Sequence, residues 1–137
     1  MKNEGTQQHE DLRQRTKEFA LRVVRMYVTL PKTTEAQVLG KQVLRSATSV
    51  GANYREAYRA RSDAEFVAKI GDCLKELDET TYWFELLTDS GIVATSRLEA
   101  LADEANQLIA IFTTIAKRVR SRLREDGTIY EGMKDEG

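Results

Sequence analysis

Apolar residues recur every three or four positions along four separate stretches of this chain. In the last stretch, for example, Leu101, Ala105, Leu108 and Phe112 follow one another at this spacing. Such spacing places the side chains on one face of a helix, and that face must be buried against a partner. The pattern predicts four helices, over residues 6–30, 35–60, 63–90 and 97–125.

The predicted helix ends carry local signals. Pro31 disfavours helical backbone in the residue before it, and Gly91 and Gly127 fit C-terminal stops. Three tetrapeptides, TEAQ, SDAE and SRLE, fit the capping box, in which a hydroxyl accepts a backbone N–H and a Glu or Gln reaches back. They begin at Thr34, Ser62 and Ser96.

Helices of similar length joined by short connections pack as antiparallel neighbours. The chain is therefore predicted to be all-α, an antiparallel up-down-up-down four-helix bundle over residues 1–125. Its 137 residues suit one domain, and 41% hydrophobic with 31% charged residues suits long amphipathic helices rather than disorder. Residues 126–137, DGTIYEGMKDEG, are predicted to be a flexible acidic tail.

Several classes of protein are disfavoured by what the sequence lacks. Cys73 is the one cysteine, so an intrachain disulfide or a cysteine metal cluster is not expected. The N-terminal segment is polar, and no window approaches the roughly 18 apolar residues of a membrane span. We expect a cytoplasmic protein that does not associate with a membrane.

Charge is distributed unevenly along the chain. Residues 31–61 carry six basic and two acidic side chains, whereas residues 62–92 carry two basic and eight acidic ones. Five cations lie between Lys117 and Arg124. Three interpretations stay open: balance of charge within the bundle and its helix dipoles, head-to-tail self-association, or contact with a phosphate backbone. The candidate phosphate-contacting residues are Arg55, Arg59, Arg61, Lys117, Arg118, Arg120, Arg122 and Arg124.

The second predicted helix contains an unusual run of small residues, which would let a neighbouring backbone approach closely. They are Ser46, Ala47, Ser49, Gly51 and Ala52. Glycine in a helix interior costs up to about 1 kcal/mol relative to alanine, so a packing gain at Gly51 is expected.

Polar residues of the same helix are predicted to form a structural cluster. Arg45 lies sixteen residues before the turn near Arg61 and Glu79 lies eighteen after it, so we expect them to form a partly buried ion pair. Asn53, Glu56 and Arg59 follow at intervals of three residues, which makes them neighbours on the helix surface. Asn53 is expected to hydrogen-bond across a packed interface.

The run from Leu44 to Leu87 resembles the bacterial four helix bundle protein family. That family includes proteins encoded in intervening sequences of large-subunit ribosomal RNA genes, and it is related to the accessory proteins of diversity-generating retroelements. The matching residues are Arg45, Ala47, Ser49, Asn53, Glu56, Arg61, Glu65, Phe66, Leu74 and Glu79. The chain departs from the family in having Tyr54-Arg55-Glu56-Ala57 in place of Ile-Ala-Glu-Gly, and Glu76 in place of a small residue.

The resemblance implies a left-handed four-helix bundle that assembles as a ring-like homopentamer, with no known enzyme activity. For the retroelement relatives it implies binding of nucleic acid and of a reverse transcriptase.

Catalytic signatures are scarce in the sequence. His9 is the one histidine, so the Glu-x-x-His pairs of a di-iron bundle are absent and Cys73 lacks an activating base. No phosphate-binding loop or dinucleotide fingerprint occurs. We expect no enzyme activity, cofactor or metal, although a small-molecule pocket at Arg45, Asn53 and Glu79 stays an alternative.

Two functional hypotheses follow. The first is a homo-oligomeric accessory protein that associates with RNA or DNA, with a reverse transcriptase as a further candidate partner. The second is a homo-oligomeric protein-interaction scaffold that binds no nucleic acid.

Overall fold

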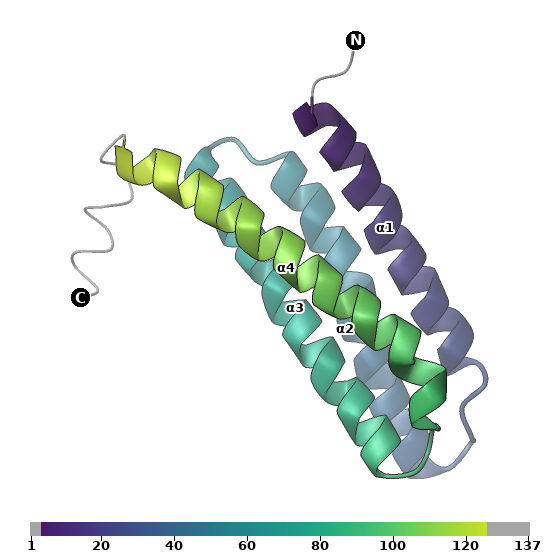
Figure 1. Cartoon of the computed structure of the whole chain (residues 1–137). Coiled ribbons are helices and arrows are strands. Elements are labelled where there is room, and N and C mark those ends of the chain that lie inside the picture. The colour runs from purple at the N-terminus through teal and green to yellow at the C-terminus, as the bar shows by residue number, and fades with distance from the viewer. Residues whose placement is uncertain (1–3, 126–137) are drawn as a thin grey trace, which may run out of the picture.

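The computed structural model describes residues 4–125, which form four helices. The helices are α1 (Glu4–Tyr27), α2 (Thr34–Tyr58), α3 (Asp63–Asp89) and α4 (Thr95–Glu125). Consecutive helices run antiparallel, and no strand occurs in residues 4–125 (Figure 1). The predicted all-α four-helix bundle is therefore confirmed. The predicted tail, residues 126–137, and the stop at Gly127 lie outside the described residues.

The apolar faces of all four helices meet in one core. Phe19 of α1, Val43 of α2, Leu77 of α3 and Phe112 of α4 are all fully buried. Burying a side chain of this kind stabilises the fold by about 1.5–3 kcal/mol, so the packed faces hold the bundle together.

The bundle opens at the end where α1 begins and α4 ends. Figure 1 shows the N-terminal end of α1 and the C-terminal end of α4 well apart, while the two helices approach each other toward the other end. There, Arg15 donates to Glu104 from its Nη2 at 2.6 Å, and the Nη2 of Arg97 donates to the hydroxyl of Thr29 at 2.9 Å. The end of α4 therefore rests on α3 rather than on α1.

A small second cluster fixes the end of α4. Val119 and Leu123 of α4 pack with Val67 of α3, and the half-buried Phe66 covers them. We call this group the outer cluster. Phe66 also packs against the main core, so it joins the two groups, and the outer cluster holds the last turns of α4 on α3.

The start of α3 has the predicted capping box. The hydroxyl of Ser62 accepts from the backbone N–H of Glu65 at 3.1 Å. The carboxylate of Glu65 in turn accepts from the backbone N–H of Arg61 at 3.2 Å, one residue before the cap. Two N–H groups at this helix end are thereby satisfied.

The capping predictions for α2 and α4 were each wrong. In α2 the cap is Thr33, whose hydroxyl accepts from Ala36 N–H at 3.4 Å, and Thr34 is the first helical residue. Two successive threonines can both serve as a cap, and the one placed outside the first turn does so. Helix α4 begins at Thr95, so Ser96 lies inside its first turn and cannot cap it.

Gly91 ends α3 as predicted. Its φ of 79° lies in the left-handed region, its N–H donates to the carbonyl of Thr88, and Ile92 N–H donates to the carbonyl of Leu87. These bonds form the Schellman motif. Helix α1 ends earlier than predicted, because Leu30 N–H bonds to Tyr27 three residues back and tightens the chain into a turn before Pro31.

The small residues of α2 have different environments. Ser46 and Ala47 are fully buried, and a Cβ on Gly51 would lie 3.2 Å from the hydroxyl of Thr16, so α1 and α2 are close there. Ala52 is exposed and does not contribute, because it lies on the outer side of α2. The buried hydroxyls of Ser46 and Thr80 are 2.8 Å apart and join α2 to α3.

Candidate nucleic-acid interface

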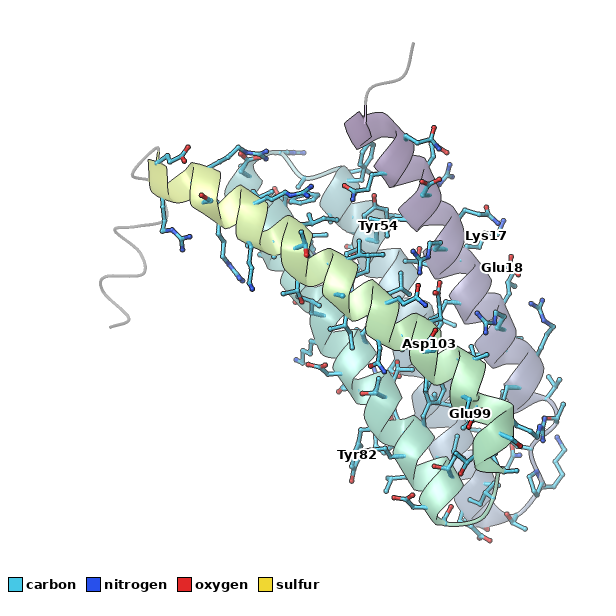
Figure 2. All side chains as sticks on the ribbon, viewed as in Figure 1. Lys17, Glu18, Tyr54, Tyr82, Glu99 and Asp103 are labelled. Atoms are coloured by element: carbon cyan, nitrogen blue, oxygen red, sulfur yellow. The ribbon has the colours of Figure 1, made fainter. Side chains whose placement is uncertain are left out.

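Charge is distributed unevenly along α3 and α4. Residues 113–125, the last turns of α4, carry five basic and one acidic side chain. Residues 76–112, the second half of α3 and the first part of α4, carry one basic and eight acidic side chains. Figure 2 shows two of these acids, Glu99 and Asp103, on the part of α4 that lies away from its C-terminal end.

The open end of the bundle contains a cavity of about 560 Å³ between the start of α1, the α2–α3 turn and the end of α4. Arg61, Arg118 and Arg122 line it. Among its described lining residues, Asp63 carries the one carboxylate, and its Oδ2 lies 3.8 Å from the Nη2 of Arg122. We call this hollow the basic cavity; its polar and aromatic lining consists of His9, Tyr54, Tyr58, Arg61, Arg118 and Arg122.

Three rings form one wall of the basic cavity. Tyr54 lies between α1 and α4 (Figure 2), and its hydroxyl lies 2.9 Å from the Nδ1 of His9. The ring of His9 stacks on Tyr58, with centroids 3.2 Å apart and planes 6° from parallel. Tyr58 nevertheless keeps 53% of its surface exposed. A stacked but accessible ring and three arginines therefore line the same cavity.

The titration of these rings follows from their burial. Burial raises the pKa of Tyr54, and the nearby Tyr58, Cys73 and Glu10 raise it further, so its hydroxyl stays protonated. Burial lowers the pKa of His9; Glu10 opposes this effect and Arg13 adds to it. The Nδ1 of a neutral His9 can accept a hydrogen bond from the Tyr54 hydroxyl.

Arg55 belongs to a second basic group, which the sequence prediction missed in part. It lines a hollow of about 190 Å³ between α1 and α2 together with Glu10, Arg13 and Lys17. Figure 2 shows Lys17 on α1. The prediction did not include Arg13 and Lys17, although their spacing of four residues places them on one helix face.

The remaining predicted cations are spread over the surface. Arg59, Lys117 and Arg124 are exposed, and Arg120 is half-buried. None of the four lines the basic cavity or the Arg55 hollow in the described part of the chain.

The expected contact between Arg45 and Glu79 is present, with Nη2 and Oε2 3.1 Å apart. The pair lies at the surface rather than partly buried, since half of the Arg45 side chain is exposed. Arg45 also contacts the less exposed Glu76, whose Oε2 is 3.2 Å from Nη1. Burial raises the pKa of Glu76, as does Glu79, while Arg45 opposes the rise. The three side chains form a structural bridge between α2 and α3.

The other two residues predicted for this cluster lie apart from it. Glu56 contacts Lys69 of α3, with 3.6 Å between Oε1 and Nζ. Asn53 is half-buried and makes no side-chain hydrogen bond to the residues that the structure describes, contrary to our expectation.

Metal ligands, membrane-spanning helices and the one cysteine bear on the kind of site that the chain can form. In residues 4–125, no group of three or more His, Cys, Asp and Glu side chains is placed to hold a metal ion. The helices described are each too short or too polar to span a bilayer. Cys73 is buried, and burial, with a smaller effect of Asp72, raises the pKa of its thiol to about 12.

The chain was compared with known proteins. Residues 8–114 match the family model described as 23S rRNA-intervening sequence protein, so Lys117–Arg124 lie beyond the match. Curated protein sequences contain no match. A solved structure from Bacteroides thetaiotaomicron, a protein of unknown function from the S23 ribosomal protein family, has a TM-score of 0.72 and 37% sequence identity. The similarity covers 77% of this chain and 97% of that one. Sequence and fold agree with the resemblance found above, and the chain belongs to the family of 23S rRNA-intervening sequence proteins.

Proposed function

We propose that this protein is a non-enzymatic, homo-oligomeric accessory protein of the cytoplasm that associates with nucleic acid through its basic end. The observation that carries the proposal is the gathering of Arg61, Arg118 and Arg122 around one cavity, away from the acidic residues 76–112. The family description, which refers to a ribosomal RNA sequence, makes RNA the first candidate and DNA the second.

Arginine suits this role because its planar, permanently charged guanidinium binds phosphate oxygens in pairs. Each phosphate that a cation neutralises releases a counterion, so affinity falls as salt concentration rises. For single strands the slope of log K against log salt is roughly 0.7 per contact.

The test is fluorescence anisotropy with a labelled RNA over a salt series. The variant Arg118→Gln/Arg120→Gln/Arg122→Gln/Arg124→Gln should weaken binding and reduce the salt slope by up to about 3, because four contacts are removed. The matched control Lys32→Gln/Lys41→Gln/Lys75→Gln/Arg97→Gln removes the same charge outside the lining of the basic cavity and should keep the slope. Equal losses in both variants, or no RNA binding by the wild type, would refute the proposal.

Self-association is the second part of the proposal, and the resemblance makes a homopentameric ring the first candidate. Its support is a stripe of exposed apolar side chains at the end of α1 and in the turn that follows it, Leu21, Val24 and Val28. Arg22 and Arg25 accompany them, whereas α3 presents many acids, and this asymmetry suits a head-to-tail contact. Light scattering after size exclusion should give several protomers for the wild type and one for Val24→Asp/Val28→Asp, whereas Ala100→Asp on α4 should stay associated.

The alternative is a protein-interaction scaffold, which the same apolar stripe favours. It would be preferred if the wild type retained no RNA at any salt concentration and the four-arginine variant lost its assembly. A reverse transcriptase is a further candidate partner, for which the support is the resemblance to retroelement accessory proteins. Co-purification with a reverse transcriptase encoded beside this gene is the corresponding test.

A further inference from the structure

We infer that the basic cavity is a nucleotide site: it takes one unpaired base against its aromatic wall and the attached phosphate on its arginines. The inference rests on the proposed association with nucleic acid and makes it more specific, because it selects single strands over duplexes. The nucleotide could come from the end of a strand or be free in solution, and the experiment below distinguishes these sources.

The first argument is the positive charge that three arginines place around the basic cavity. Arg118 and Arg122 are four residues apart on α4, and Arg61 reaches the same cavity from the α2–α3 turn. Arg122 has a long contact with Asp63, at 3.8 Å, whereas Arg61 and Arg118 have no ion pair with the side chains that the structure describes. Like charges that face one hollow repel one another, so an anion bound among them is stabilised by all three.

The second argument is the aromatic wall of the basic cavity. Tyr58 is held in place by stacking on His9, and His9 is held by its hydrogen bond to the buried Tyr54. A ring that is fixed and still 53% exposed offers a stacking surface at little entropic cost. Apolar side chains of Phe66, Ile115 and Val119 complete the lining.

The third argument is size. A volume of about 560 Å³ lies within the range of about 300–1,000 Å³ that small-molecule sites occupy. It suits a base with its phosphate, but a base pair within a duplex keeps its faces stacked and cannot enter. Cations beside an accessible aromatic ring are the arrangement by which proteins hold single strands.

The test compares oligoribonucleotides that carry 2-aminopurine at the 5′ end. The wild type should bind a 5′-phosphorylated single strand at least tenfold more tightly than the blunt duplex of the same sequence, with quenching of 2-aminopurine by stacking. Tyr58→Ala should weaken this binding roughly 5- to 150-fold and abolish the quenching. Tyr58→Phe keeps the ring and should bind as the wild type does, which separates loss of stacking from loss of folding.

The matched control is Tyr82→Ala. Tyr82 is 52% exposed, close to the value for Tyr58, but it lies on α3 far from the cavity (Figure 2), so binding should not change. For the arginines, Arg61→Gln and Arg118→Gln should each weaken binding more than Arg124→Gln, which removes a charge outside the cavity lining.

The outcomes separate the two proposals. If RNA binds with salt dependence but Tyr58→Ala behaves like Tyr82→Ala, or the duplex binds as tightly as the single strand, the nucleotide site is wrong and the broader function stands. If no strand binds but adenosine monophosphate binds with the same sensitivity to Tyr58 and Arg118, the site is right for a free nucleotide and the broader function is wrong. If neither strand nor nucleotide binds, both are wrong.

Discussion

Three helical glycines allow the closeness of the helix contacts to be tested by stability measurements. Replacing glycine with alanine inside a helix stabilises it by up to about 1 kcal/mol, unless the new methyl group meets another atom. A Cβ at Gly71 would meet nothing within 4 Å, one at Gly51 would lie 3.2 Å from Thr16 Oγ1, and one at Gly40 would lie 2.6 Å from Leu30 Cδ1. The available room therefore decreases from Gly71 to Gly51 to Gly40.

These distances give three different expected changes in the free energy of unfolding. Gly71→Ala should gain the full value, about 1 kcal/mol. Gly51→Ala should change stability little, since Thr16 is buried and its hydroxyl is held by a 2.8 Å bond to the carbonyl of Leu12, so the crowding offsets the gain. Gly40→Ala must displace the buried end of Leu30; an overpacking cost of about 1–3 kcal/mol leaves a net loss of about 1 kcal/mol.

The measurement is urea denaturation followed by far-UV circular dichroism at one fixed protomer concentration, because association adds to apparent stability. In a Thr16→Ala background the obstructing hydroxyl is gone, and Gly51→Ala should then stabilise by about 1 kcal/mol. The difference between backgrounds is the coupling energy between the two residues. Equal stabilisation by Gly51→Ala and Gly71→Ala would refute the close α1–α2 contact. An effect of Gly51→Ala that is the same in the wild-type and Thr16→Ala backgrounds would refute it as well.

Three further predictions concern titratable groups. Burial lowers the pKa of His9, so the contribution of this residue to stability is complete above pH 6.5 and is lost as pH falls through the pKa that His9 has in the folded protein. A plot of Tm against pH should show this decline for the wild type and not for His9→Gln. Burial raises the pKa of Glu76, so the contribution of this residue to stability is complete below pH 4.5 and is lost as pH rises through its pKa in the folded protein. The stability of Glu76→Gln relative to the wild type should therefore increase from acidic to neutral pH. The pKa of about 12 for Cys73, against 9.0 for an ordinary thiol, reduces the fraction of thiolate at pH 8 roughly a thousandfold. Iodoacetamide should therefore label Cys73 only after unfolding, and rapid labelling of the native protein would contradict the burial of this residue.

Much of the fold could be predicted because each helix has one apolar face and the connections are short. Helix ends were predicted correctly where one residue alone could supply the signal, as Ser62 and Gly91 did. They were wrong at Thr34, where the neighbouring Thr33 could cap equally well. The separation of α4 from α1 at one end was not predictable, because periodicity indicates which face is buried and not the angle at which helices cross.

The candidate site likewise contains contacts that could be predicted from the sequence and contacts that could not. The contact of Arg45 with Glu79 could be predicted, because residues equally far from a hairpin turn lie level with each other. The basic cavity could not, since Arg61 and Arg118 lie far apart in the sequence and meet only through the packing of α4 on α3. His9 was placed in a polar segment without a role, and nothing local indicates that it stacks on Tyr58.

The outer cluster has a consequence for how the end of α4 behaves over time. Val67, Val119 and Leu123 are a small anchor compared with the main core, so the last turns of α4 can open locally while the rest of the bundle stays folded. Amide hydrogens of residues 117–125 should therefore exchange faster than those around Leu77, and Leu123→Ala should accelerate them selectively. The last turns of α4, which position Arg118 and Arg122, should therefore unfold at a lower temperature than the rest of the bundle.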